Sequence, residues 1–143
     1  MFDIATRDVM ERRKVLKLPS AARVLKAARM LARRNAGAIL VLDDERLVGI
    51  ITEPDIVYRV VARGLDPDAT QVREVMTPEP VTIGPDAPFG RALALMHSKG
   101  FRHLPVVDAG AVLGIVSARS AMDPDVEEFV SEARRREHFM THV

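Results

Sequence analysis

The sequence predicts a mixed α/β (α+β) fold in which one β-α-β-β-α unit occurs twice. The first observation is an internal repeat: Val9-Met10 matches Val75-Met76, 66 residues later. Likewise, Gly49-Ile50-Ile51-Thr52 matches Gly114-Ile115-Val116-Ser117, 65 residues later. The second observation is that the hydrophobic periodicity changes in the same order in both halves. Because a repeated unit that cannot bury its apolar face alone stacks on its copy, we expect a pseudo-two-fold axis with a cleft on it.

Each unit begins with a short strand followed by a helix. Apolar residues alternate with polar ones in the strand, and the helix has apolar residues at i, i+4 and i+7. Asn35 and Gly100 tolerate positive φ and are expected to end the helices. The apolar positions are Leu16, Leu18, Val24, Ala28 and Leu31 in the first unit and Val81, Ile83, Phe89, Leu93 and Met96 in the second.

Two strands and a second helix complete each unit. Residues 38–42 and 47–51, and then 104–107 and 112–116, are apolar runs separated by short turns, which predicts strands buried on both faces. In the first unit a helix follows Thr52, because Pro54 fits a first helical turn. In the second unit only a short helical turn is expected after Ser117.

These patterns divide the chain into a first unit at 1–66, a second unit at 67–122 and a tail at 123–143. The tail reads as an amphipathic helix capped by Asp123. Its apolar stripe, Val126, Phe129, Val130 and Ala133, needs a partner surface.

The composition excludes several classes of protein. The 21 basic and 20 acidic side chains produce no strong net field that would attract nucleic acid or anionic lipid. There is no cysteine for a disulfide, a thiolate zinc site or a nucleophile. No apolar run approaches the roughly 18 residues of a membrane span, and no signal peptide is evident. We expect a cytoplasmic protein that binds neither nucleic acid nor membrane.

Thr52 and Asp55 are the first candidate site residues. They lie three residues apart at a helix start, where free N–H groups and the helix dipole favour a phosphate. A carboxylate there can also accept hydrogen bonds from a ribose diol. Thr-x-x-Asp is equally a variant of the capping box, which satisfies the same N–H groups without a ligand. The spacing leaves both interpretations open.

The residues between Arg7 and Met122 resemble a tandem pair of CBS domains, a Bateman module. The Asp8-Val9-Met10 opening, the strand pair and the ending from Gly49 to Ile56 carry the resemblance. It implies a regulatory or sensor module, not an enzyme, with AMP, ADP, ATP or S-adenosylmethionine bound between the repeats. It also implies a homodimer and an effector protein that the sequence does not identify.

The resemblance also implies two unequal sites. In the equipped site, basic residues of the second unit reach the phosphate over the Thr52 corner, and the backbone near Val81 holds the adenine edge. The second site has Ser120 in place of the aspartate, and serine is the weaker acceptor. The equipped site comprises Thr52, Asp55, Ile50, Ile51, Val81, Thr82, Arg102 and His103, and the weaker site comprises Val15, Leu16, Ala38, Ser117 and Ser120.

Simpler roles remain open for several residues. Arg102 fits a surface ion pair, and His103 fits a hydrogen-bonded strand histidine. His138 and His142 have helical metal-ligand spacing but no evident third ligand, so we expect no metal site and no catalytic residue. Val57, Val60 and Val61 are expected to form, with the tail, the dimer contact.

Three classes of function therefore compete. The first is a stand-alone sensor that binds an adenosine ligand. The second is a structural or protein-interaction module whose ligand sites have decayed, as the loss of an aspartate at Ser120 allows. The third, a nucleic-acid binder using arginine clusters, is disfavoured because the chain has no Trp, a single Tyr and a net charge of +1.

Overall fold

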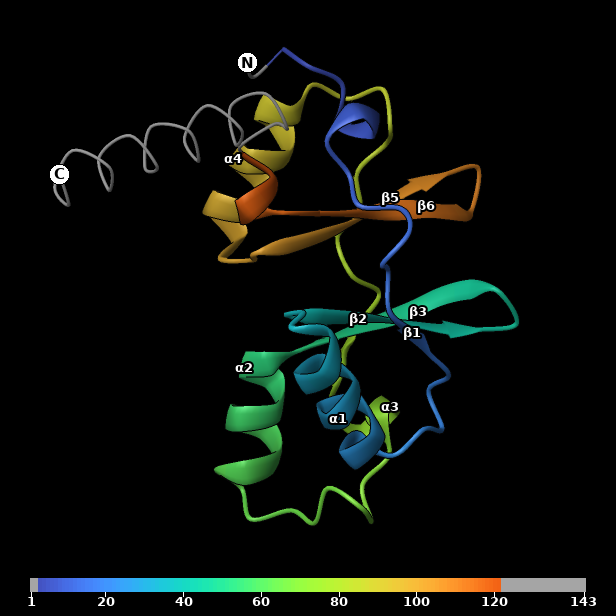
Figure 1. Cartoon of the computed structure of the whole chain (residues 1–143), viewed down its shortest axis with the longest axis vertical. Helices are drawn as coiled ribbons and strands as arrows, with labels where there is room; N and C mark the ends of the chain where they lie inside the picture. The colour runs from blue at the N-terminus through green and yellow to red at the C-terminus, as the bar shows by residue number, and fades with distance from the viewer. Residues whose placement is uncertain (1–2, 122–143) are drawn as a thin grey trace, which may run out of the picture.

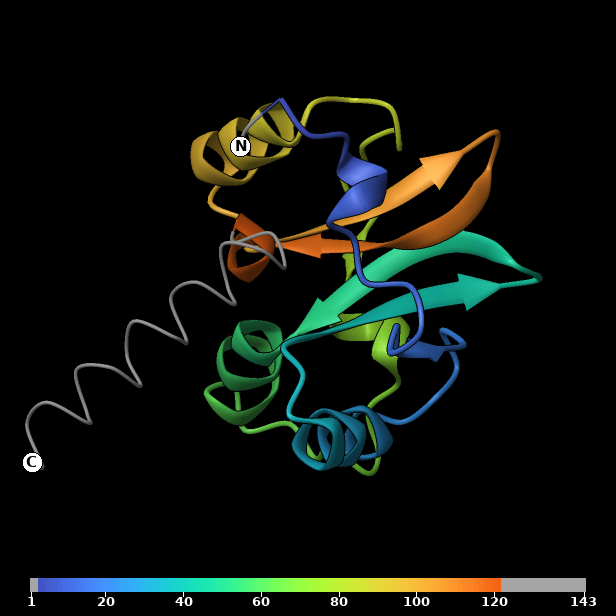
Figure 2. The same cartoon turned by 45° about the horizontal axis from the view of Figure 1, so that its top comes forward.

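The computed structural model describes residues 3–121, so the predicted helix at 123–143 lies outside the described residues. Two β-hairpins face each other in the middle of the molecule, and helices cover their outer faces (Figure 1). The same two layers, related by a pseudo-two-fold axis, are visible in the tilted view (Figure 2). This arrangement confirms the predicted mixed fold of two tandem units.

The elements follow the predicted order in both units. A single β-bridge between Ile83 and Val106 replaces the first strand of the second unit. A π-helical turn, Val57–Val61, continues α2, and 3₁₀ turns lie at Thr6–Asp8 and Ala118–Ala121. The first unit contains β1 (Lys17–Leu18), α1 (Val24–Arg34), β2 (Ala38–Asp43), β3 (Arg46–Thr52) and α2 (Glu53–Ile56); the second contains α3 (Val72–Val75), β4 (Thr77–Pro78), α4 (Phe89–Lys99), β5 (His103–Asp108) and β6 (Ala111–Ser117).

The strands form a four-stranded sheet in the order β1-β2-β3-β4 and a two-stranded sheet, β5-β6. Strand β1 runs parallel to β2, and the other pairs are antiparallel. Both hairpins contain a register shift at equivalent positions, Val41/Leu42 and Val106/Val107. The two hairpins therefore repeat each other down to their irregularities.

Three apolar clusters hold these layers together. One lies under α1, one lies under α4, and a middle cluster joins the facing hairpins. In the middle cluster Ala38, Leu40 and Ile50 of the first unit pack against Val112 and Ile115 of the second. Burial of this shared surface fixes the two units against each other.

The buried helical stripes differ from the prediction at one equivalent position in each unit. Ala27 and Ala92 are fully buried, whereas Ala28 and Leu93 are partly exposed. Positions i+3 and i+4 both lie on the buried side of a helix, and periodicity does not choose between them. An alanine at the innermost position allows the helix to approach the strands closely.

Two segments cross between the units. The amide of Thr6 donates to Ala87 O (2.9 Å), so the N-terminal segment joins the core under α4. Conversely, the amide of Val72 donates to Ala22 O (2.7 Å), and α3 joins the core under α1. The sequence repeat predicts a boundary at residue 66. In the structure, each of the two helix-covered cores contains residues from both sides of this boundary.

Gly49 and Gly114 make room for these crossing segments. A Cβ at Gly49 would overlap the sulfur of Met76. A Cβ at Gly114 would lie 2.5 Å from the carbonyl oxygen of Glu11 and 3.0 Å from the sulfur of Met10. Each glycine thus makes room for the end of the segment that crosses from the opposite unit.

Candidate functional site

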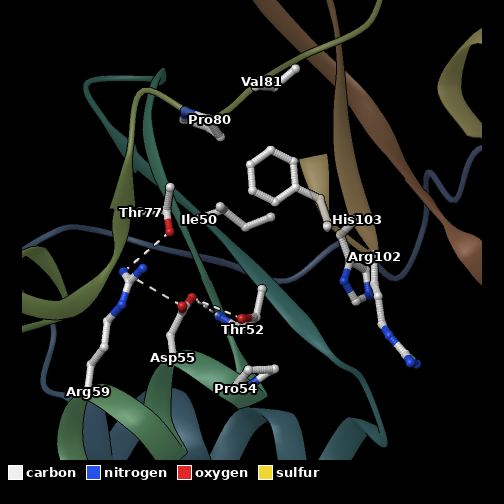
Figure 3. A pocket seen from close by; sticks show the side chains of 12 residues that line it. Ile50, Thr52, Pro54, Asp55, Arg59, Thr77, Pro80, Val81, Arg102 and His103 are labelled. Atoms are coloured by element: carbon white, nitrogen blue, oxygen red, sulfur yellow. Dashed lines mark hydrogen bonds and ion pairs between the residues drawn. The ribbon is translucent and has the colours of Figure 1, made fainter. Parts of the chain in front are cut away.

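A cavity of about 260 Å³ opens between the end of β3 and the start of β5 (Figure 3). Residues from both units and from the segment that links them surround it. The lining residues are Ile50, Thr52, Pro54, Asp55, Arg59, Thr77, Pro80, Val81, Gly100, Phe101, Arg102 and His103. Six of the eight residues predicted for the equipped site are therefore brought together here.

Thr52 and Asp55 form the polar corner of this cavity. Strand β3 ends at Thr52, and α2 begins at the next residue with Pro54 in its first turn. The amide and the hydroxyl of Thr52 both donate to Asp55 Oδ2, each at 2.9 Å. The pair therefore makes a capping box, and Asp55 also lines the cavity with its side chain 12% exposed. A helix cap and a carboxylate that faces the cavity are compatible, because the cap uses only Oδ2 and an ionised carboxylate has about four acceptor sites.

Arg59 holds the other oxygen of this carboxylate. It lies one helical turn after Asp55, and its Nη1 is 3.6 Å from Asp55 Oδ1. The same atom donates to Val75 O (2.9 Å) and Thr77 Oγ1 (3.3 Å). Figure 3 shows this guanidinium between Asp55 and Thr77. Sequence reasoning missed Arg59, although an Asp-Arg pair at i, i+4 on a helix was a usable signal.

An apolar slot lies above the polar corner. Ile50, Pro80, Val81 and Phe101 line it, and Phe101 is 37% exposed. Within residues 3–121, the N–H and C=O of Val81 have no hydrogen-bond partner. The slot therefore offers contact area to a flat apolar group, beside a residue whose backbone N–H and C=O are unpaired among the described residues.

Two predicted residues do not line this cavity. Ile51 is fully buried in the core under α1, because neighbours on a strand point to opposite faces and Ile50 faces the cavity. Thr82 is exposed and lies outside the lining. These two side chains therefore do not line the cavity, whereas contact of the backbone near Thr82 with the adenine edge stays a prediction.

Arg102 and His103 form the basic end. Across residues 3–121, Arg102 makes no ion pair, so the surface ion pair considered from the sequence has no partner there. His103 packs against Gly37, where a Cβ would lie 3.0 Å from its Cε1 atom. Burial, the largest cause, lowers the pKa of His103 below 6.5, Glu53 raises it, and Arg102 lowers it again. The imidazole is therefore neutral at pH 7.

This lowered pKa predicts how stability changes with pH. Between an unfolded pKa of about 6.5 and the lower folded value, the unfolded chain binds more protons than the folded one. We therefore expect stability to fall as the pH drops through this window. Urea unfolding between pH 7.5 and 5 measures it, with His103→Gln as control. Equal pH dependence in both proteins would contradict the assignment.

The weaker second site is not assembled as predicted. Ser117 and Ser120 reproduce the corner, with Ser117 N donating to Ser120 Oγ at 3.2 Å. However, Val15 and Ala38 pack in the middle cluster, and Leu16 packs against the core under α1. The cavity at this end includes Ser117 but not Ser120. At the position equivalent to the apolar slot of the first cavity, side chains packed between the hairpins leave no second slot within residues 3–121.

Two repeated units whose hairpins face each other, with a cavity lined by both units, are the features of a tandem-repeat module. The sequence model of the CBS domain matches residues 6–62 and 72–124, and the chain belongs to this family. It is 40% identical over 104 residues to CBS domain-containing protein CBSCBSPB3 of Arabidopsis thaliana, covering 72% of this chain and 19% of that protein. The chain thus spans about a fifth of the length of this curated relative.

Two solved structures with bound ligands share the fold. CBS domain protein PAE2072 from Pyrobaculum aerophilum, complexed with AMP, has a TM-score of 0.77 and 25% identity, covering 90% of this chain and 99% of that chain. The CBS domain pair of protein MJ0100, in complex with 5′-methylthioadenosine and S-adenosyl-L-methionine, has a TM-score of 0.74 and 25% identity, covering 82% and 92%. These ligands belong to those proteins.

Neither a metal centre nor a membrane span is found in the part of the chain that the structure describes. Residues 3–121 contain no cluster of three His, Asp or Glu side chains that could bind a metal ion. None of their helices has the length and apolar character needed to cross a bilayer. His138 and His142 lie outside the described residues.

Proposed function

We propose that this chain is a regulatory module that binds one adenosine-containing nucleotide in the cavity between its two units. AMP, ADP, ATP and S-adenosylmethionine are the candidate ligands, and an effector protein reads the bound state. The proposal assigns no catalysis to the chain. The observation that carries it is the cavity itself, whose lining combines a carboxylate corner, an apolar slot and a basic end.

Each part of the cavity suits one part of a nucleotide. Asp55 can accept hydrogen bonds from the ribose diol, and charge-assisted bonds of this kind are the strong ones. The free N–H and C=O of Val81 suit the donor and acceptor on the adenine edge. Arg102 and His103 line the same cavity, and a guanidinium beside an imidazole suits the phosphate attached to the ribose. The adenosine ligands bound by PAE2072 and MJ0100 support an adenosine-containing ligand for this chain as well.

Titration calorimetry with AMP, ATP, S-adenosylmethionine and adenosine tests the proposal. We expect one molecule bound per chain. No binding by any of them would favour the alternative, a structural or protein-interaction module with decayed sites. A salt-dependent gel shift with DNA or RNA would instead support a nucleic-acid binder.

Arg102→Ala should separate phosphate recognition from folding. If Arg102 contacts the phosphate, its loss weakens AMP and ATP far more than adenosine, and most strongly at low salt. Calorimetry at two salt concentrations measures this, with the exposed Arg63→Ala as a matched control. If Arg102→Ala weakens the binding of adenosine as much as that of AMP and ATP, Arg102 stabilises the fold and does not contact the phosphate.

We also propose that the chain is a homodimer. Val57, Tyr58 and Val61 lie on one helical segment and are 51%, 70% and 67% exposed, whereas Val60, also predicted for this face, is fully buried. Soluble monomers rarely expose large apolar patches. We expect a dimer in sedimentation at micromolar concentration, and a monomer when Val57 and Val61 are both changed to Glu. A monomeric unmodified chain would contradict the proposal, whereas loss of the dimer on truncation at Asp123 would assign the contact to the tail.

A further inference from the structure

A second cavity, of about 680 Å³, adjoins the first. Pro54, Arg102 and His103 line both cavities, so the basic end of the first borders the second. Figure 3 shows the side chain of Arg102 extending away from Asp55 and Arg59, which lie at the polar corner of the first cavity. A group attached beyond the first phosphate of a bound nucleotide would therefore enter the second cavity.

The second cavity carries its own cation, Arg119. The corner Ser117-Ala118-Arg119-Ser120 occupies the position that Thr52-Glu53-Pro54-Asp55 occupies in the first unit. Relative to the first corner, it has lost the ribose-binding carboxylate and gained a guanidinium in place of Pro54. This exchange makes the corner unsuited to a ribose diol, but a guanidinium and a serine hydroxyl suit a phosphate.

The charge balance of this cavity also favours an anion. Arg102 and Arg119 contribute two positive charges, Glu53 is the one carboxylate in the lining, and His103 is neutral at pH 7. Arg102 and His103 suffice for a single phosphate at the junction. A monophosphate would leave Arg119 and most of the larger cavity unused.

We infer that the second cavity binds the outer phosphates of a nucleoside di- or triphosphate whose nucleoside occupies the first cavity. Arg119 contacts the outer phosphates, and the second corner serves the same ligand as the first. This inference rests on the proposed function and selects among its candidate ligands. It predicts ADP or ATP in preference to AMP and S-adenosylmethionine.

Calorimetry on the full chain with AMP, ADP and ATP tests the inference. We expect ATP to bind at least about tenfold more tightly than AMP, the size of one hydrogen bond to a charged group. Arg119→Ala should remove this gain and leave AMP unchanged, and Arg63→Ala should change neither ligand. Glu53→Gln should tighten ATP in the absence of divalent cations, because it removes the opposing charge.

Equal affinities for AMP and ATP, a preference for S-adenosylmethionine, or equal weakening of AMP and ATP by Arg119→Ala would each overturn the inference. In those cases the proposed function stands, because an adenosine ligand still binds. If no adenosine compound binds, both the proposed function and the inference are overturned. Thermal unfolding of each variant without ligand shows whether a lost affinity reflects a lost fold.

Discussion

Asp55→Ala should remove most of the affinity for an adenosine nucleotide, whereas Ser120→Ala should leave it almost unchanged. Each hydrogen bond lost from the ribose to the carboxylate costs about 1.5–3 kcal/mol, more than tenfold in affinity. Ser120 occupies the equivalent position in the second corner but lines neither of the two cavities described above. Calorimetry with the preferred nucleotide measures both variants.

The same substitution also removes a helix cap, which typically costs about 1 kcal/mol of stability. Asp55→Asn keeps the size of the side chain and some capping ability, so it helps to separate binding from folding. Loss of affinity for adenosine with little change for 2′,3′-dideoxyadenosine would locate the effect at the diol. Two equal sites per chain, or equal losses for the Asp55 and Ser120 variants, would contradict the asymmetry of the two corners.

The elements of the fold were predictable because their signals are local. Asn35 and Gly100 end their helices with φ of 49° and 73°, as their tolerance of positive φ indicated. Apolar runs and turn residues likewise located the hairpins. The crossing of residues 4–10 and 70–76 to opposite cores was not predictable, because an apolar pattern shows that a segment is buried and not against which surface.

The residues of the site were likewise predictable where they form a local motif, and not where only the fold brings them together. Thr52 and Asp55 form a local motif, and the structure places both at the cavity. The resemblance assigns both Ile50 and Ile51 to the site. Because neighbouring residues on a strand point to opposite faces, only one of them can face the cavity. Phe101 was missed, because only the fold brings the residue after the α4 cap to the apolar slot.

The corner at Ser117–Ser120 differs from the equivalent corner at Thr52–Asp55 in two residues that bear on ligand binding. The sequence alone shows that Ser120 replaces an aspartate, which reads as a loss. The structure adds that Arg119, which stands where the first unit has Pro54, lines a cavity that shares Arg102 and His103 with the first. The loss of the carboxylate and the gain of a guanidinium are together expected of a corner that binds phosphate instead of ribose. Calorimetry with AMP, ADP and ATP distinguishes this interpretation from decay.

Phe89→Ala and Phe101→Ala should have opposite consequences, although both remove one phenyl ring from a residue near an end of α4. Phe89 is 1% exposed and lies in the core under this helix, so its loss should cost about 3–5 kcal/mol. Domains of this kind have a total stability of only about 5–15 kcal/mol, so this variant should be marginally folded. Phe101 is 37% exposed at the slot, and its loss should weaken the nucleotide and leave stability within about 1 kcal/mol.

Urea unfolding without ligand and calorimetry with the nucleotide measure the two effects separately. Phe89→Leu keeps most of the buried volume and serves if the alanine variant does not fold. The contrast depends on where each ring lies: one fills a core that exists without ligand, and the other lines a slot that the adenine would fill. Equal losses of stability would mean that Phe101 belongs to the core, and unchanged affinity in Phe101→Ala would mean that the base binds elsewhere.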